Sequence, residues 1–356
     1  MTVMKHWTLQ LIALCLLPVN HLAAEPRDTP WALAVQWDND LLTGTDDGYT
    51  NGSRVAFTRA LKLDAPEHSL LQRFLRSLTG ADRNNFFDDL RFDKSAVQNI
   101  QFGVGLSQLM FTPDNPNVPT PPAGERPYAG WLGAEFSLQA ASEKSANTAT
   151  LSIGTTGKNS YAEESQDWVH QNISDSPIFQ GWDSQAPSEL TINLHFDHKT
   201  RLSFLDDFKR PIEMDGFYEW GASLGNFRTD AYLGAFLRTG YNLPASYTTP
   251  RVQLGSFTDT IFGKNGAKQT DFSFYGFVGA RTYAILHDIA LDGPLSRDWA
   301  ESVDSEPIVG EITFGVAAQW KCIELSLAHN LRSDEFDGQQ NRSRYGSVLF
   351  RIGTQF

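Results

Sequence analysis

The sequence predicts an all-β fold, a twelve-stranded antiparallel transmembrane β-barrel of the bacterial outer membrane. Three observations predict it. The first residues have the order of a secretory signal, later segments alternate apolar and polar side chains with the period of a strand, and the chain ends on the aromatic Phe356. No later segment offers 18 consecutive apolar residues, so the sequence contains no candidate transmembrane helix.

Residues 1–24 form the predicted signal peptide. Lys5 stands near the start, an apolar run occupies 9–19, and the small pair Ala23-Ala24 precedes a charged stretch. The apolar run is too short to span a bilayer. The alternative is a buried N-terminal helix, but the order of the three regions favours export.

Composition narrows the class of protein. The formal charge of −13 argues against nucleic acid as a partner. The 24 Phe, 10 Tyr, 9 Trp and 28 Gly suit a membrane barrel with aromatic girdles. Cleavage of the signal leaves Cys322 as the only cysteine, so neither an internal disulfide nor a thiol metal site is expected.

The mature domain, residues 25–356, contains twelve segments that we predict to be strands. They cover 31–38, 50–60, 98–111, 128–140, 147–156, 189–200, 215–225, 230–241, 272–284, 308–319, 321–331 and 344–356. In the last of them, Val348, Phe350 and Ile352 share one face, while Ser347 and Arg351 lie on the other. An even number of such strands is typical of bacterial barrels. A soluble β-sandwich or a periplasmic barrel would also produce alternating strands.

The connections between the strands are uneven in length. The stretch 113–127 is rich in proline, which predicts a loop. The connections 61–97 and 242–271 are long, although both fall on the side where turns are short if the N-terminus is periplasmic. The sequence leaves the role of these two connections open.

Three polar clusters lie in loops near 38–50, 112–127 and 157–188. These loops follow the first, third and fifth predicted strands. Odd-numbered strands of an antiparallel barrel run in the same direction, so the three loops open on the same side. With a periplasmic N-terminus that side faces outward, and we expect the clusters to converge on one external site.

Two residues in these clusters suggest specific chemistry. Asp40 stands among amide, carboxylate and hydroxyl side chains, an oxygen-rich set that suits Ca²⁺, although a solvated acidic loop is an open alternative. His170 has the side chain most often used as a general base near neutral pH, although it could also be an ordinary surface histidine. No Gly-x-Ser-x-Gly motif occurs, which argues against a serine hydrolase of the α/β type.

Taken together, these stretches resemble a known family, the outer-membrane lipid A deacylases of the LpxR type. The matching stretches are Asn39-Asp40, Tyr49-Thr50-Asn51-Gly52, Arg126-Pro127-Tyr128-Ala129-Gly130-Trp131, the His170 loop with Gln180-Gly181-Trp182-Asp183 and Gln185, and Tyr218-Glu219-Trp220-Gly221 through Gly240-Tyr241. The resemblance extends over nearly all of the mature chain.

The resemblance implies a twelve-stranded barrel and Ca²⁺-dependent hydrolysis of the 3′-linked acyloxyacyl ester of lipid A, with a metal-stabilised oxyanion. The roles it implies are His170 as the base, Asn39 and Thr50 as further catalytic residues, Asp40 and Asp175 as metal ligands, and Arg126 and Tyr128 as substrate-binding residues.

The implied partners are lipopolysaccharide as substrate and the outer-membrane assembly machinery, and we expect a monomer whose site faces the outer leaflet. Two alternatives stay open. Active members of the family have a lysine in the loop before Arg126, but the stretch 114–118 has none, which fits a related barrel with altered or lost catalysis. A porin-like channel is the second alternative.

Overall fold

The computed structural model of the chain describes residues 30–39, 48–61, 99–115, 117–174, 177–207, 211–248, 250–257, 259–261 and 271–353. The predicted signal peptide, the connection 62–98, Asp40, Asp175 and the terminal Phe356 lie outside the described residues.

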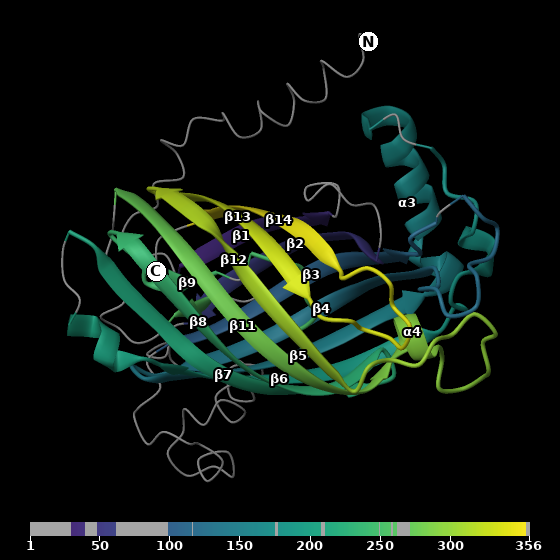
Figure 1. The fold of residues 1–356 in the computed structure, drawn as a ribbon. Coiled ribbons are helices and arrows are strands. Elements are labelled where there is room, and N and C mark those ends of the chain that lie inside the picture. The colour runs from purple at the N-terminus through teal and green to yellow at the C-terminus, as the bar shows by residue number, and fades with distance from the viewer. Residues whose placement is uncertain are drawn as a thin grey trace, which may run out of the picture.

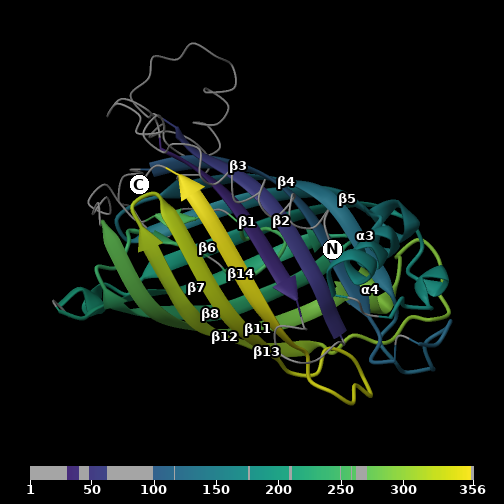
Figure 2. The ribbon, with the colours of Figure 1, turned by 90° about the horizontal axis from the view of Figure 1, so that it is seen from above.

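Within the described part of the chain, twelve antiparallel strands close into one barrel (Figure 1, Figure 2). In order they are β1 (Trp31–Asn39), β2 (Gly48–Leu61), β3 (Asn99–Thr112), β4 (Ala129–Ala141), β5 (Ser145–Thr156), β6 (Leu190–Arg201), β7 (Glu213–Gly225), β8 (Arg228–Tyr241), β11 (Phe272–Asp288), β12 (Ile308–Trp320), β13 (Ile323–Arg332) and β14 (Arg344–Gly353). Strand β1 pairs with β14, which completes the ring.

All twelve predicted strands are confirmed. The largest difference is in β11, which continues four residues beyond the predicted end at 284. A bulge between Ile285 and His287 allows this extension, because it lets pairing with β8 resume as far as Asp288. Alternation of side chains was therefore sufficient to find every strand of the barrel.

The side chains of strand β6 show why the barrel wall can lie in a lipid bilayer. Leu190, Ile192 and Leu194 are exposed on the outer face, while the alternating residues Thr191 and Asn193 are buried on the inner face. The same division of apolar outer and polar inner side chains is the pattern of outer-membrane barrels. No helix in the described residues has both the length and the apolar character needed to cross a membrane.

The lumen is filled with paired charges. Arg54 on β2 contacts Glu135 on β4 at 2.8 Å, and both side chains are fully buried. Arg281 on β11 forms an ion pair with Glu219 on β7. Buried charges are stable in a protein interior only when they are paired, so these contacts fix the inner wall.

The long connection between β8 and β11 folds back into this lumen. We call its described residues 243–248, 250–257 and 259–261 the plug. Two short strands, β9 (Ser246–Tyr247) and β10 (Thr260–Ile261), pair with each other within it, and Figure 1 shows β9 among the barrel strands. The interior position explains how a long connection fits on the side where short turns were expected.

Strand β1 ends at the opposite end of the barrel, which we call the loop end, and the connections that follow β3, β5, β7, β11 and β13 lie there. Two helices lie there, α3 (Ala162–Val169) and α4 (Ile289–Asp292), and Figure 1 shows both at the same end of the ring. The ends of β1, β3 and β5, where the three predicted site loops begin, therefore lie at one end of the barrel, as strand parity predicts.

Candidate active site

The candidate site lies on the outer face of the wall rather than over the lumen. In β1, Val35 and Trp37 are exposed on the outer face, so the alternation places Asn39 on that face too. In β3, the exposed Leu106 places Met110 on the outer face in the same way. Both residues are nevertheless buried, because something outside the wall covers them.

A single row of residues crosses four strands at this position. Asn39 lies opposite Asn51, Asn51 lies opposite Met110, and Met110 lies opposite Gly130. The amide of Asn51 also receives a hydrogen bond of 2.7 Å from the indole N–H of Trp37. The row brings together the first two sequence clusters, which are distant in the chain.

Thr50 and Asn39 are linked directly. The Asn39 side-chain amide donates to the backbone carbonyl of Thr50 at 3.1 Å. The Thr50 hydroxyl shares a hydrogen bond with the hydroxyl of Thr112 at the end of β3. A register shift between Tyr49 and Asn51 interrupts the alternation of β2 here, and such bulges often redirect a side chain at a functional site.

The connection between β5 and β6, residues 157–189, covers the row from outside. Gly130 makes this possible, because a Cβ there would lie 2.2 Å from the Ser160 hydroxyl and 2.5 Å from the Ala162 Cβ. The amide of Gln108 on β3 donates to the carbonyl of Ser160 at 2.7 Å. The start of α3 is therefore held against the wall at β3 and β4.

An apolar cluster fills the space between the cover and the wall. It consists of Met110, Tyr128, Ala162, Phe179 and Trp182, all buried. Gly181 lets Trp182 approach, because a Cβ at that glycine would lie 2.2 Å from the Tyr128 ring. Tyr128, predicted to bind substrate, is thus a buried packing residue directly beneath the cover.

His170 stands where α3 changes into a short π-helix, His170–Ser174. Its ring is 4% exposed and meets the edge of Phe179 with 4.9 Å between ring centroids. Its Nδ1 lies 2.7 Å from the carbonyl oxygen of Pro177. A carbonyl only accepts, so Nδ1 carries the proton and the neutral ring has its lone pair on Nε2.

Asp167, one helical turn before His170, was missed by the sequence reasoning. Burial raises the pKa of its carboxyl above the ordinary value, and the nearby His170 opposes that rise. One carboxyl oxygen is buried without a hydrogen-bond partner among the described residues. The signal that could have found Asp167 is helical spacing, since residues three apart share one helix face.

Arg126 does not join this site. Its guanidinium contacts Glu335 at 2.7 Å in the connection between β13 and β14, and lies over the rings of Phe111 and Phe336. Arg126, Glu335 and Phe111 all line one cavity inside the barrel. The structure therefore separates Arg126 from His170, Asn39, Thr50 and Tyr128 by the thickness of the wall.

Glu335 is held ionised at this luminal position. Burial by itself would raise the pKa of its carboxyl, but the positive charges of Arg332 and Arg126 outweigh burial and lower the pKa to about 2. Ser343 donates a further hydrogen bond to the carboxylate. The cluster closes the loop end of the barrel from within.

The residues around Asn39 determine which metal the candidate site suits. The described residues contain no group of three His, Cys, Asp or Glu side chains that could hold a metal ion. The two predicted acidic ligands, Asp40 and Asp175, lie outside them. What the described residues supply near Asn39 is oxygen, from the hydroxyls of Thr50 and Thr112 and from the Thr50 carbonyl. Hard cations such as Ca²⁺ prefer this donor type.

A closed antiparallel barrel with an apolar outer face, a polar lumen and a buried histidine in the connection that covers its outer face defines an outer-membrane β-barrel protein with a wall-side site. The family model described as outer membrane protein LpxR matches residues 9–354. The chain belongs to the LpxR family, and the protein is located in the outer membrane.

The solved structure of one LpxR protein supports the fold. LpxR from Salmonella typhimurium is 17% identical, with 90% of this chain and 99% of that chain covered and a TM-score of 0.68. The β domain of the Bordetella autotransporter BrkA is 9% identical over 91% of this chain and 98% of its own, with a TM-score of 0.38. That score is too low to carry a functional comparison. No curated protein sequence matches the chain significantly.

Proposed function

We propose that this protein is a Ca²⁺-dependent lipid A deacylase that hydrolyses the 3′-linked acyloxyacyl ester, with His170 as the general base. The observation that carries the proposal is the arrangement of His170. It is a buried imidazole in the cover of an outer-wall site, and its Nδ1 is bonded to the Pro177 carbonyl, which leaves Nε2 as the basic nitrogen.

In the proposed reaction, His170 takes one proton from water and passes it to the leaving group. His170 Nε2 takes a proton from a water molecule as the water oxygen bonds to the ester carbonyl carbon. The carbon–oxygen bond to the sugar then breaks, and the imidazolium returns the proton to the leaving sugar oxygen. Asp167, one turn away, stabilises the imidazolium by its negative charge.

The donor set fits a hard cation in type, because Asn39 and Thr50 offer oxygen and the adjoining Asp40 is the predicted carboxylate. When bound there, Ca²⁺ would polarise the ester carbonyl and stabilise the negative charge that develops on its oxygen. The amide of Asn39 would orient the metal ligands through its bond to the Thr50 carbonyl.

The position of the site supports a lipid substrate over a soluble ester. The outer face beside it carries Trp37, and the cover carries exposed Tyr161, Trp168 and Ile178. Exposed apolar side chains of this kind suit contact with acyl chains. A substrate embedded in the outer leaflet can reach this wall laterally, whereas a water-soluble molecule would have no reason to favour it.

The test is mass spectrometry of lipid A from outer membranes that contain the protein, with Ca²⁺ and with a chelator. The expected result is loss of one acyloxyacyl group, which disappears on chelation and in His170→Ala. Unchanged lipid A beside a correctly folded barrel in Ca²⁺ would overturn the proposal.

A second candidate is a lipid-binding barrel without hydrolysis. It is favoured by the engagement of Arg126 with Glu335, because this arginine then cannot replace the lysine that the stretch 114–118 lacks. Under this alternative, lipid A binds to the folded protein and leaves unchanged in mass. Measuring retention of lipid A and its mass in the same preparation separates the two candidates.

A further inference from the structure

The plug forms hydrogen bonds or ion pairs with ten of the twelve barrel strands. Arg238 on β8 donates to the carbonyls of Ser246 and Pro244 at 2.6 and 2.8 Å, which holds the entry of the plug. Six residues further along the plug have hydrogen-bond or ion-pair partners on the wall: Thr248, Arg251, Val252, Gln253, Gly255 and Asp259. Their partners lie on strands β1 to β5 and on strands β11 to β14. A connection that only crossed the barrel mouth would not reach so many strands.

Apolar clusters seal both ends of the plug. Near its entry, Leu243 packs with Tyr275 and Phe277. Near the loop end, Val252 and Leu254 pack in a cluster of buried residues that comes from several strands and from α4. That cluster consists of Tyr49, Leu109, Trp131, Phe227, Val252, Leu254, Ile289 and Tyr345. Apolar packing at a constriction excludes water and therefore ions.

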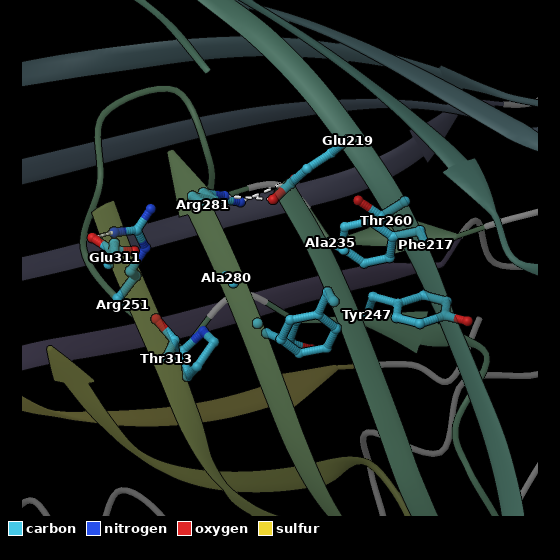
Figure 3. Close-up of a pocket in the computed structure, with 14 residues that line it drawn as sticks. Phe217, Glu219, Ala235, Tyr247, Arg251, Thr260, Ala280, Arg281, Glu311 and Thr313 are labelled. Atoms are coloured by element: carbon cyan, nitrogen blue, oxygen red, sulfur yellow. Dashed lines mark hydrogen bonds and ion pairs between the residues drawn. The ribbon is translucent and has the colours of Figure 1, made fainter. Parts of the chain in front are cut away.

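Arg251 of the plug lines two cavities that described residues form inside the barrel. One lies between the plug and strands β7, β8, β11 and β12, and the other is the loop-end cavity that Arg126 and Glu335 also line. Figure 3 shows Arg251 beside Glu311, and Arg281 joined to Glu219, within the first cavity. Arg251 also donates to the Tyr283 hydroxyl at 2.6 Å. These contacts place a fixed charged barrier between the two spaces.

Val252 connects the plug to the candidate site through the wall. Its backbone N–H donates to the Asp38 carboxylate at 2.8 Å, and its carbonyl accepts from the Tyr49 hydroxyl at 3.3 Å. Val252 therefore contacts Asp38 and Tyr49 from the lumen. The residues next to these two, Asn39 and Thr50, are predicted site residues.

We propose that the plug closes the lumen to ions and that, through Val252, it positions Asn39 and Thr50; the second half of this proposal rests on the proposed function. Tyr49 and Asp38 are then positioning residues. The lumen is then closed to ions, and the barrel serves to position the residues that react on its outer face.

The seal is tested by single-channel recording in planar lipid bilayers with the full-length mature protein. The intact protein is expected to show no steady conductance, and a variant with residues 243–261 replaced by a short Gly–Ser linker is expected to conduct. Steady conductance of the intact protein would overturn the proposal, and so would a folded linker variant that stays silent. Folding is checked by heat-modifiable migration in electrophoresis.

A point variant covers the case in which the linker variant does not fold. Arg251→Ala removes the side chain that lines both cavities, while Glu311 keeps its contact with Arg332 at 3.0 Å. We expect a conductance that is measurable but smaller than that of a fully opened barrel. A folded Arg251→Ala protein with no conductance would show that Arg251 is not part of the barrier, because the apolar clusters at both ends of the plug remain in this variant.

The positioning role is tested by Tyr49→Phe, with Thr248→Val as the matched control. Each change deletes one hydroxyl hydrogen bond between plug and wall, but the Thr248 bond goes to Glu324 on β13, a strand that carries no predicted site residue. Tyr49→Phe is expected to increase amide hydrogen exchange in peptides covering 31–39 and 48–61, and to lower kcat several-fold with little change in KM.

These readouts distinguish the two possible failures. If the protein has no deacylase activity, exchange and conductance still report on the plug, and only the proposed function fails. If activity is present but Tyr49→Phe and Thr248→Val behave alike in exchange and in kcat, the positioning role is wrong while the proposed function stands.

Discussion

The Asp38 carboxylate accepts the backbone N–H of Val252 at 2.8 Å, although the two residues are 214 positions apart in the chain. The bond joins the luminal face of the first barrel strand to a connection that enters from the far end. The next residue, Asn39, faces the opposite side of the wall. Because the wall is a single layer of strands, Asp38 contacts the plug in the lumen while the adjacent Asn39 lies at the candidate site on the outer face.

Replacement of His170 is expected to remove most activity without unfolding the barrel. A positioned general base contributes about 10²–10⁴-fold to a rate, so His170→Ala and His170→Gln should each lower kcat by about that factor. Release of the acyloxyacyl group from lipid A measures it. Equal activity of wild type and both variants, at equal amounts of folded barrel, would show that another group acts as base.

Gly130→Ala is expected to displace the cover. The added Cβ would meet Ser160 at 2.2 Å and Ala162 at 2.5 Å, so α3 must move away from the wall. A displacement of about 1 Å can cost 10²-fold in rate, and the 157–189 connection should become sensitive to protease. The matched control is Gly310→Ala on β12, where a Cβ meets nothing within 4 Å. Equal protease resistance in the two variants would contradict the predicted packing.

Glu335 is expected to make the stability of the loop end depend on pH. Its folded pKa of about 2 lies below the ordinary 4.5, so its stabilising effect is present above about 4.5 and is lost as pH falls toward 2. The effect is on the order of 3 kcal/mol. In Glu335→Gln the free energy of unfolding, measured by urea titration, should be lower at neutral pH and change less across this window.

Arg126→Ala is expected to lower stability rather than lipid affinity. The change leaves the buried Glu335 carboxylate with Arg332 as its remaining ion-pair partner, and breaking a buried pair costs about 3 kcal/mol. Lys158→Ala is the control, because its ion pair with Asp183 is exposed and contributes little. A raised KM for lipid A in Arg126→Ala with unchanged stability would instead indicate a substrate-binding role.

The sequence by itself determined the barrel. Alternating side chains are a local property of each strand, because one face must meet lipid and the other must meet the lumen. Every strand of the barrel, from β1 to β14, could therefore be predicted from its own residues, whereas the two short strands of the plug could not. Strand parity also placed the three site loops at one end, since antiparallel order fixes the direction of each strand.

Only the tertiary structure decided which side of the wall each loop residue occupies. Arg126 and Tyr128 are two positions apart, yet Arg126 pairs with Glu335 in the lumen and Tyr128 packs beneath the cover outside. The plug was also invisible in the sequence, because its residues owe their burial to distant partners such as Asp38 and Glu135 rather than to any local pattern. Contacts between segments far apart in the chain carry no periodic signal, so the support of the site became apparent only once the barrel had closed around it.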